Sequence, residues 1–266
     1  MKSLRDMMDI SGHVALVTGG AGHLGLAFCE ALAELGAQVC VIDIAADRAA
    51  ERANYIRERF SVKTSAIAAD ITLETEVERA IRELLVSHGR LDILVNNAAY
   101  APRNLKPDGL SLDQQSVAQW EAQLAIILNG TFLMARACVP HLTVHQRGVI
   151  INISSIYGLV GPDPSLYEGL AMSNAAYYAA GKGGIVQLTR YLATLLAPSI
   201  RVNCIAPGGI WRNQPEAFHQ RYKDRTPLGR MAVEEDLKGA LAYLASDLSA
   251  YMTGQVLAVD GGWTAW

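Results

Sequence analysis

Tyr178 and Lys182 are the two residues of this sequence whose types and spacing best suit proton transfer. They stand four positions apart with only small residues between them, so on a helix both side chains project from the same face. A phenol alone is a poor base at neutral pH because its unperturbed pKa is about 10. An ammonium group one helical turn away favours the phenolate and lowers the pKa of the phenol. The pair is therefore a candidate acid–base site, although a lone pair at this spacing also arises by chance on amphipathic helices.

A glycine-rich turn near the N-terminus has the residue types that hold a phosphate group. The segment Thr18-Gly19-Gly20-Ala21-Gly22-His23-Leu24-Gly25 follows an apolar run and opens into helical sequence. Glycines let the backbone turn sharply and approach a pyrophosphate, whose charge is favoured by the amides of the following helix N-terminus. The turn therefore predicts a dinucleotide cofactor, with contacts from Gly19, Gly22, His23 and Leu24.

The carboxylate of Asp43 indicates which dinucleotide this is. Asp43 ends the second apolar run, eighteen residues after Gly25. A carboxylate at this place can accept both ribose hydroxyls of adenosine and would repel a 2′-phosphate. No arginine or lysine lies in the glycine-rich turn or within four residues after Asp43. We therefore predict NAD in preference to NADP; the alternative is a solvated carboxylate at the end of a strand.

Two further strand ends supply candidate cofactor contacts. Asp70 and Ile71 end the third apolar run and could hold the adenine edge, or Asp70 could instead cap a helix. Asn97 and Ala98 follow the fourth run, where small residues would let the backbone pass close to the cofactor. Ligands of open α/β sheets bind at the carboxyl ends of the strands, where all four residues would lie.

Seven short apolar runs alternate with longer helical stretches, and this alternation predicts the fold. Nearly all the runs are continuously apolar, as parallel strands covered by helices on both faces require. The chain therefore predicts a single doubly wound Rossmann-type domain over residues 1–266, an α/β fold with a seven-stranded parallel sheet and helices on both faces. Strands are expected at Val14–Thr18, Gln38–Asp43, Thr64–Asp70, Ile93–Asn96, Val149–Ser154, Arg201–Ala206 and Val256–Val259. Helices are expected near 24–35, 46–59, 74–88, 111–141, 175–197 and 234–246.

Composition argues against several classes of function. The net charge is −3 and there is no basic stripe, so nucleic acid is not an expected ligand. The longest apolar runs, such as Leu124–Leu128, are far shorter than the roughly 20 residues of a membrane helix, and residues 1–10 carry charges in place of the apolar core of a secretion signal. The four cysteines are widely spaced and the histidines lack paired metal-ligand spacing. We therefore expect no metal site, no disulfide framework and a cytoplasmic location.

Taken together, the motifs resemble those of the short-chain dehydrogenase/reductase family over nearly the whole chain. Beyond the glycine-rich turn and the Tyr178/Lys182 pair, the shared motifs are Asn96-Asn97-Ala98, Ile151-Asn152-Ile153-Ser154-Ser155, Arg201-Val202-Asn203 with Pro207-Gly208, Thr253-Gly254-Gln255 and Val259-Asp260-Gly261-Gly262. The resemblance implies that Tyr178 is the general acid/base, that Lys182 lowers its pKa and binds the nicotinamide ribose, and that Ser155 polarises the substrate oxygen. Ser154 is the rival, but the second serine is the family's usual catalytic one. The resemblance also places Pro207, Gly208 and Ile210 beside the nicotinamide.

Two departures from the family pattern concern the cofactor and the proton path. The glycine spacing is that of the family's longer branch, with His23 where the shorter branch has a glycine. The family's catalytic asparagine falls seven residues after a tryptophan, and counting from Trp120 gives Ile127. Asn129 lies roughly 200° further around a helix and cannot simply replace it. In the family that asparagine holds a water linking the lysine to solvent, so the proton relay is in question here.

Two other departures concern the substrate side. Ser155 and Tyr178 are twenty-three residues apart, more than the family usually has, which places residues 158–174 over the active site. Arg212 stands two positions after Ile210, where a threonine often touches the cofactor. The segments near 100–115, 158–174 and 209–225 are expected to cover the substrate.

Several short stretches resemble a subgroup associated with sugar modification of flagellin and surface polysaccharides. They are Ser155-Ile156-Tyr157-Gly158, Tyr167-Glu168-Gly169 and the segment from Gly208 to Phe218. That resemblance implies a sugar or sugar derivative as substrate. It makes candidate hydroxyl- or phosphate-binding groups of Arg103, Tyr157, Glu168, Arg212 and Asn213. For each arginine the alternative is a solvated surface charge.

The leading hypothesis is an NAD-dependent oxidoreductase that interconverts a secondary alcohol and a ketone, on a sugar-like small molecule. The alternatives are an isomerase or lyase that uses NAD transiently, with Glu168 available as an additional base, and a non-catalytic NAD-binding regulator. The family commonly assembles through its long helices, so we expect a homotetramer, with a dimer as second choice. The C-terminal Trp263 and Trp266, which a monomer would have to expose, favour such an assembly.

Overall fold

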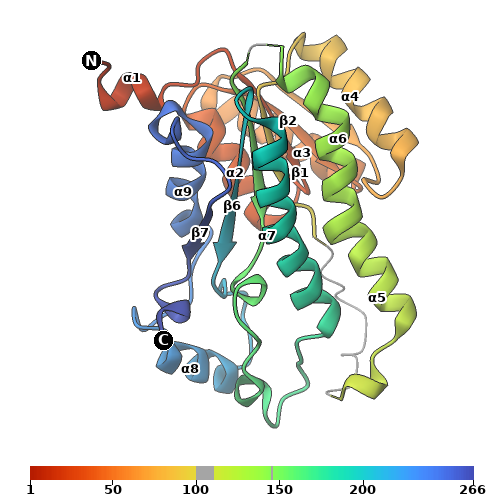
Figure 1. Ribbon diagram of the computed structural model, residues 1–266, viewed down its shortest axis with the longest axis vertical. Coiled ribbons are helices and arrows are strands. Elements are labelled where there is room, and N and C mark those ends of the chain that lie inside the picture. The colour runs from red at the N-terminus through yellow and green to blue at the C-terminus, as the bar shows by residue number, and fades with distance from the viewer. Residues whose placement is uncertain (100–110, 145) are drawn as a thin grey trace.

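One parallel sheet organises the molecule, in the strand order β3-β2-β1-β4-β5-β6-β7 (Figure 1). The computed structural model describes residues 1–99, 111–144 and 146–266. The strands are β1 (Val14–Thr18), β2 (Gln38–Asp43), β3 (Thr64–Ala68), β4 (Ile93–Asn96), β5 (Gly148–Ile153), β6 (Ile200–Pro207) and β7 (Val256–Val259). The predicted α/β fold and its seven-stranded sheet are confirmed, and only β3 ends more than one residue from its expected bounds.

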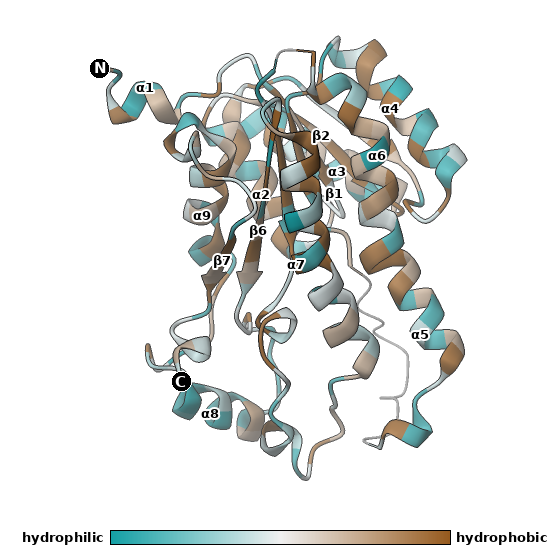
Figure 2. Ribbon diagram, viewed as in Figure 1, coloured by the Kyte–Doolittle hydropathy of each residue, from teal (hydrophilic) through white to brown (hydrophobic). Residues whose placement is uncertain are grey.

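Helices cover both faces of the sheet, and the pleat of β1 shows why its residues 14–17 are all apolar. Ala15 and Val17 pack on the side of α2 (His23–Glu34), α3 (Ala46–Phe60) and α9 (Glu235–Ala245). Val14 and Leu16 pack on the side of α4 (Glu74–His88), α6 (Thr131–Leu142) and α7 (Ala176–Leu196). Because successive side chains of a strand point to opposite faces, burial of both faces requires an unbroken apolar run. Brown, apolar segments accordingly recur along the strands in Figure 2.

The long helix expected near 111–141 is divided in the structure. Ser116 caps α5 (Val117–Leu124) by accepting a hydrogen bond from the amide of Gln119, so this helix begins six residues later than expected. A π-helical stretch, η2 (Ala125–Gly130), then joins α5 to α6. Stretches of this kind are frequently found at functional sites.

Several short elements were not expected from the sequence. They are α1 (Leu4–Met8), α8 (Glu216–Arg225) and the 3₁₀ turns η1 (Leu112–Gln114), η3 (Ile156–Gly158), η4 (Pro164–Tyr167), η5 (Asp247–Ser249) and η6 (Trp263–Ala265). Helix α8 buries only Phe218 and Tyr222 and is otherwise polar, so its periodicity is weak. It lies beside the 158–174 segment at the carboxyl end of the sheet (Figure 1).

The segment Val117–Leu142 corrects one expectation. By length and composition it could cross a membrane, with a mean hydropathy of 1.5, although no single apolar run within it is long. Its side chains Met134, Ala135 and Cys138 are buried against the sheet, and it contacts α4 and α7. These contacts make it a helix of the core, which explains its apolar composition.

The two C-terminal tryptophans differ from each other. Trp263 is 6% exposed and stacks on Tyr222 with ring centroids 4.4 Å apart. Trp266 is 77% exposed. The expectation that a monomer exposes both aromatics is therefore wrong for Trp263, whose partner belongs to the same chain.

Candidate functional site

A cavity of about 840 Å³ runs along the carboxyl ends of the strands, from the glycine-rich turn to Tyr178 and α8. The chain reverses its direction across the sheet between the neighbouring strands β1 and β4, and ligands of such folds bind at that point. The cavity brings together most of the residues singled out in the sequence: Gly19, Gly22, His23, Leu24, Asp43, Asn97, Ser154, Ser155, Tyr157, Tyr178, Lys182, Pro207, Gly208, Ile210 and Arg212. Asp70, Ile71, Ala98, Glu168 and Asn213 are not among its described lining residues, and Arg103 lies outside the residues that the structure describes.

The glycine-rich turn has no room for side chains. Gly19 has a φ of +63°, and a Cβ atom there would lie 2.8 Å from the Cα of Ala98. A Cβ atom at Gly25 would overlap the Gly19 carbonyl. The helix that follows, α2, has Gly22 as N-cap and receives no side-chain hydrogen bond there, so its first amides suit an anionic group. The turn therefore fits the pyrophosphate of a dinucleotide.

Asp43 is joined at this end of the cavity by an arginine that the sequence analysis did not consider. The Asp43 carboxylate accepts hydrogen bonds from the amides of Ala21, at 3.1 Å, and Ala45, at 3.0 Å. Arg48, in the first turn of α3, donates to the Ala21 carbonyl at 2.9 Å and also lines the cavity. It stands five residues after Asp43, one beyond the stretch searched for a cation. The end of the cavity where the adenosine ribose would bind, called the ribose end below, thus has one carboxylate and one guanidinium group.

The other two strand ends have mainly structural contacts. Asn97 donates to the carbonyls of Thr18 and Gly19, at 3.0 and 3.2 Å, which ties β4 to the glycine-rich turn. The Asp70 carboxylate accepts from the amide and hydroxyl of Thr72, at 2.9 and 2.7 Å. It stabilises the turn before α4 and does not cap this helix, whose N-cap is Leu73 without a side-chain hydrogen bond. Ile71 is buried against Gly130, where a Cβ atom would lie 2.6 Å from its Cδ1.

Tyr178 and Lys182 share one face of α7, and the structure distinguishes the two serines beside them. Ser154 donates to the Lys182 carbonyl at 2.8 Å, so its hydroxyl is occupied by the backbone of α7. Ser155 accepts from the Tyr157 amide at 3.2 Å and interacts with the Tyr178 phenol. The Lys182 ammonium donates to the Ile153 carbonyl at 2.8 Å and lies 5.8 Å from the centroid of the Tyr178 ring. Ser155 is therefore the serine that shares the phenol's surroundings.

Burial dominates the ionisation of this pair. It raises the pKa of Tyr178, and the hydrogen bond with Ser155 opposes the shift. Burial lowers the pKa of Lys182 from 10.5 to about 8. The expectation that Lys182 lowers the pKa of Tyr178 is thus not met by the chain's own groups, because removal of both side chains from water disfavours both charged forms.

Ile127 fills the space beside Tyr178 with hydrocarbon. It is buried in a cluster with Ile185 and Cys204, against which Tyr178 packs. Its Cγ2 lies so near α7 that a Cβ atom at Gly181 would come within 3.0 Å. Asn129 is exposed and so does not replace the family's asparagine. The structure therefore places a branched apolar side chain next to the candidate acid/base.

The far end of the cavity is aromatic and is built by two segments. Tyr157, Tyr167, Met172 and Asn174 come from the 155–174 region, and Phe218 and Tyr222 come from α8. Arg225 of α8 pairs with Asp163 at 2.5 Å, and Arg221 donates to the Glu168 carbonyl at 2.6 Å. The Tyr222 hydroxyl accepts from the Gly209 amide at 2.5 Å. Of this set the sequence analysis named only Tyr157 as a site residue; the aromatic residues of α8 had no motif to mark them.

Three residues predicted to contact the substrate have other surroundings or other roles in the structure. Arg212 lines the cavity but pairs with Glu234. Glu168 is exposed and lines a neighbouring hollow. Asn213 has a φ of +57°, a left-handed conformation that asparagine tolerates better than most residues, and this accounts for an asparagine in the turn.

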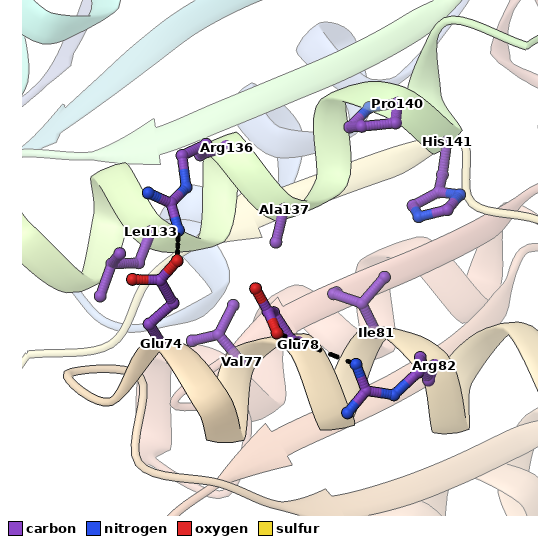
Figure 3. Close-up of a pocket in the computed structure, with 10 residues that line it drawn as sticks. All are labelled: Glu74, Val77, Glu78, Ile81, Arg82, Leu133, Arg136, Ala137, Pro140 and His141. Carbon is purple, nitrogen blue, oxygen red and sulfur yellow. Dashed lines mark hydrogen bonds and ion pairs between the residues drawn. The ribbon is translucent and has the colours of Figure 1, made fainter.

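A second hollow, of about 300 Å³, lies between α4 and α6 (Figure 3). Its floor is apolar, and its charges are paired within it, Arg136 with Glu74 and Arg82 with Glu78. None of the site residues predicted from the sequence is among its described lining residues. The larger cavity is therefore the candidate site.

Comparisons with known proteins cover almost the whole chain. A family model described as enoyl-(acyl carrier protein) reductase matches residues 19–264. The chain is 33% identical to the 3-oxoacyl-(acyl-carrier-protein) reductase FabG of Aquifex aeolicus, with 96% of this chain and 98% of that protein aligned. It is 35% identical to the cis-4-hydroxycyclohexanecarboxylate dehydrogenase of Sinomonas cyclohexanicum (95% and 96% aligned). It is 34% identical to the probable galactose dehydrogenase GalD of Rhizobium meliloti (96% of each aligned).

Several solved structures are also similar to this chain in fold and in sequence. A short-chain type dehydrogenase/reductase from Mycobacterium marinum has a TM-score of 0.87 and 31% identity, with 100% of both chains covered. A gluconate 5-dehydrogenase from Burkholderia cenocepacia, in complex with NADP and tartrate, has a TM-score of 0.88 and 31% identity, with 99% and 100% covered. An NAD⁺-bound xylitol dehydrogenase has a TM-score of 0.85 and 27% identity, with 95% and 99% covered.

Proposed function

The chain belongs to the short-chain dehydrogenase/reductase family, and from this premise we propose the reaction that its site performs. The prediction of an oxidoreductase that acts on CH–OH groups with a nicotinamide cofactor is confirmed by its relatives. Our proposal is the interconversion of a secondary alcohol and a ketone of a sugar-like molecule with NAD. The observation that carries it is one cavity with the glycine-rich turn at one end and Ser155, Tyr178 and Lys182 further along.

The chain's own residues account for proton movement. Tyr178 gives a proton to the substrate oxygen in reduction and takes it in oxidation. Ser155 donates a hydrogen bond to the same oxygen. Lys182, held by the Ile153 carbonyl, keeps a positive charge near the phenol and binds the ribose. The glycine-rich turn would hold the nicotinamide cofactor, whose chemistry when bound would be transfer of the hydride.

The preference for NAD rests on Asp43. Its carboxylate lies where a 2′-phosphate would be repelled. Arg48 acts in the opposite sense, because a guanidinium group in the same part of the cavity would attract that phosphate. We retain NAD because the Asp43 carboxylate, held by the amides of Ala21 and Ala45, is fixed in the lining of the cavity.

Two observations support a polar alcohol and a dehydrogenase reaction. The chain resembles a probable galactose dehydrogenase and is structurally similar to a xylitol dehydrogenase and a gluconate 5-dehydrogenase. Among the described residues that line the cavity, Asp43 at the ribose end is the one carboxylate. An isomerase or lyase would need a second base near Tyr178, and Glu168 lies outside the cavity.

We propose one domain over residues 1–266 and a cytoplasmic location. The four free cysteines are buried, and burial raises the pKa of Cys204 to about 11. Buried neutral thiols of this kind suit a reducing compartment.

The test is NADH formation across polyols, aldoses, amino sugars and sugar phosphates, with Tyr178→Phe as the critical variant. The substitution removes one hydroxyl, and positioned acid/base groups typically contribute about 10²–10⁴ in rate. We expect turnover to fall by at least that range while calorimetry finds NAD affinity nearly unchanged. Tyr191→Phe, on the exposed side of the same helix, is the matched control. Wild-type turnover by Tyr178→Phe would refute the mechanism.

A further inference from the structure

We propose that the aromatic end of the cavity is a subsite for an uncharged, hydroxylated ring, and that Tyr157, Tyr167 and Asn174 bind one of the ring's hydroxyl groups. The inference rests on the proposed function, since it concerns the alcohol that Tyr178 deprotonates. It narrows the substrate class from sugar derivatives in general to neutral polyols and sugars.

The polar atoms of these side chains gather beside apolar walls; Tyr157 and Tyr167 are buried and Asn174 is half-buried. The hydroxyls of Tyr157 and Tyr167 lie 2.9 Å apart, and both residues are less than 10% exposed. Asn174 hydrogen-bonds Tyr167 through its side chain. Its Oδ1 is buried and has no hydrogen-bond partner within the described part of the chain. All three residues line the cavity that contains Tyr178.

An amide oxygen buried without a partner needs a donor, because it has lost water and gained nothing in exchange. A substrate hydroxyl supplies that donor. Burial raises the pKa of both Tyr157 and Tyr167, so both phenols stay neutral and can donate and accept. A hydroxyl group, which also does both, matches this trio better than a carbonyl or an ether oxygen does.

The cations of the cavity indicate that the ring is uncharged. The lysine and arginine residues among its described lining are Arg48, Lys182 and Arg212. Arg48 is at the ribose end, Lys182 is held by the Ile153 carbonyl, and Arg212 is paired with Glu234. A phosphate or carboxylate at the aromatic end would lose its hydration without gaining a free partner among these residues, which is unfavourable.

The apolar walls suit the C–H faces of a ring. Phe218 and Tyr167 lie 5.4 Å apart between centroids, and Met172 and Met231 complete the wall. The 158–174 segment and α8, which are joined by the Arg225–Asp163 ion pair, therefore shape the subsite together. The 158–174 segment would therefore help to determine which alcohol the enzyme accepts.

The test compares ring alcohols that differ by one hydroxyl. We would measure kcat/KM for cyclohexanol and for cis- and trans-cyclohexane-1,2-diol with the wild-type enzyme, Tyr167→Phe and Asn174→Leu. We expect the wild type to prefer one diol over cyclohexanol at least tenfold. Each variant should lower that ratio about tenfold, which corresponds to one neutral hydrogen bond. Tyr191→Phe, a tyrosine outside the cavity, should leave the ratio unchanged.

A second comparison tests the charge argument. Galactose should be oxidised at least tenfold more efficiently than galactose 6-phosphate or galacturonate. The subsite is overturned if neither variant changes the diol ratio, or if an anionic sugar is the better substrate. Cyclohexanol oxidation without any diol preference also overturns the subsite and leaves the proposed function intact. No oxidation of any of these alcohols counts against both.

Discussion

Replacement of Lys182 by methionine should abolish activity and stabilise the fold at neutral pH. Lys182 is 4% exposed, and burial lowers its pKa from 10.5 to about 8. Each pKa unit corresponds to about 1.4 kcal/mol, so the buried ammonium costs about 3 kcal/mol of stability below pH 8. Methionine leaves the Ile153 carbonyl without its donor, which costs about 1–3 kcal/mol. The net gain is on the order of 1 kcal/mol, or about 2–4 °C in Tm for a chain of this size.

The pH dependence of this stability gain tests whether the buried Lys182 ammonium is its cause. The unfolded state binds the Lys182 proton more tightly than the folded state, so the wild type gains stability as pH rises from about 8 to 10.5. Methionine has no such proton, so its advantage should shrink across that interval and turn into a deficit of about 1–3 kcal/mol above it, because the Ile153 carbonyl still lacks its donor. Urea denaturation of both proteins at pH 7, 8, 9 and 10.5 measures this difference, with Lys63→Met, an exposed lysine, as control. A difference between variant and wild type that stays constant from pH 7 to 10.5 would refute the assignment of the effect to the buried ammonium.

Three other predictions concern the cofactor, the proton path and assembly. Calorimetric titration should find NAD bound at least tenfold more tightly than NADP, about 1.4 kcal/mol, and Asp43→Ser should narrow the gap; equal wild-type affinities would remove Asp43 from the site. Ile127→Asn should raise kcat or shift the alkaline limb of its pH profile if only the water relay is missing, whereas a neutral or harmful effect would mean a rerouted path. Light scattering at micromolar concentration should give the mass of a tetramer, because Phe132, Tyr191 and Leu195 expose large apolar side chains on α6 and α7; a monomer mass would contradict this.

The sheet could be predicted from the sequence because each buried strand carries its own signal. Val14–Thr18 is buried at every position and apolar at all but its last residue, and the glycine-rich turn follows it directly. The wrong predictions concern helices whose bounds or existence are not marked by a local apolar pattern. The helix expected from residue 111 begins at Val117, since Ser116 caps it, and α8 was missed because it buries only two side chains.

The two ends of the cavity were not equally predictable. Tyr178 and Lys182 lie one helical turn apart, and Ser155 stands two residues after β5, so the carboxyl end of one strand and the face of one helix bring them to the site. The aromatic end depends on Phe218 meeting Tyr167, residues about fifty positions apart that no short pattern connects. Arg48 could not be predicted from the strand end alone, because it stands five residues after Asp43 and reaches the cavity from the first turn of α3.

The surroundings of Ile127 show how a departure from the family pattern is accommodated. A β-branched side chain beside α7 needs a neighbour without a Cβ atom, and Gly181 provides it, since a Cβ there would lie 3.0 Å from the Ile127 Cγ2. The two residues are therefore one packing unit, with Cys204 and Ile185 behind them. Hydrocarbon on this side of Tyr178 adds to the burial that raises its pKa. Because the chain's own groups leave that pKa raised, a bound cofactor with a positively charged nicotinamide ring would have to supply the charge that favours the phenolate.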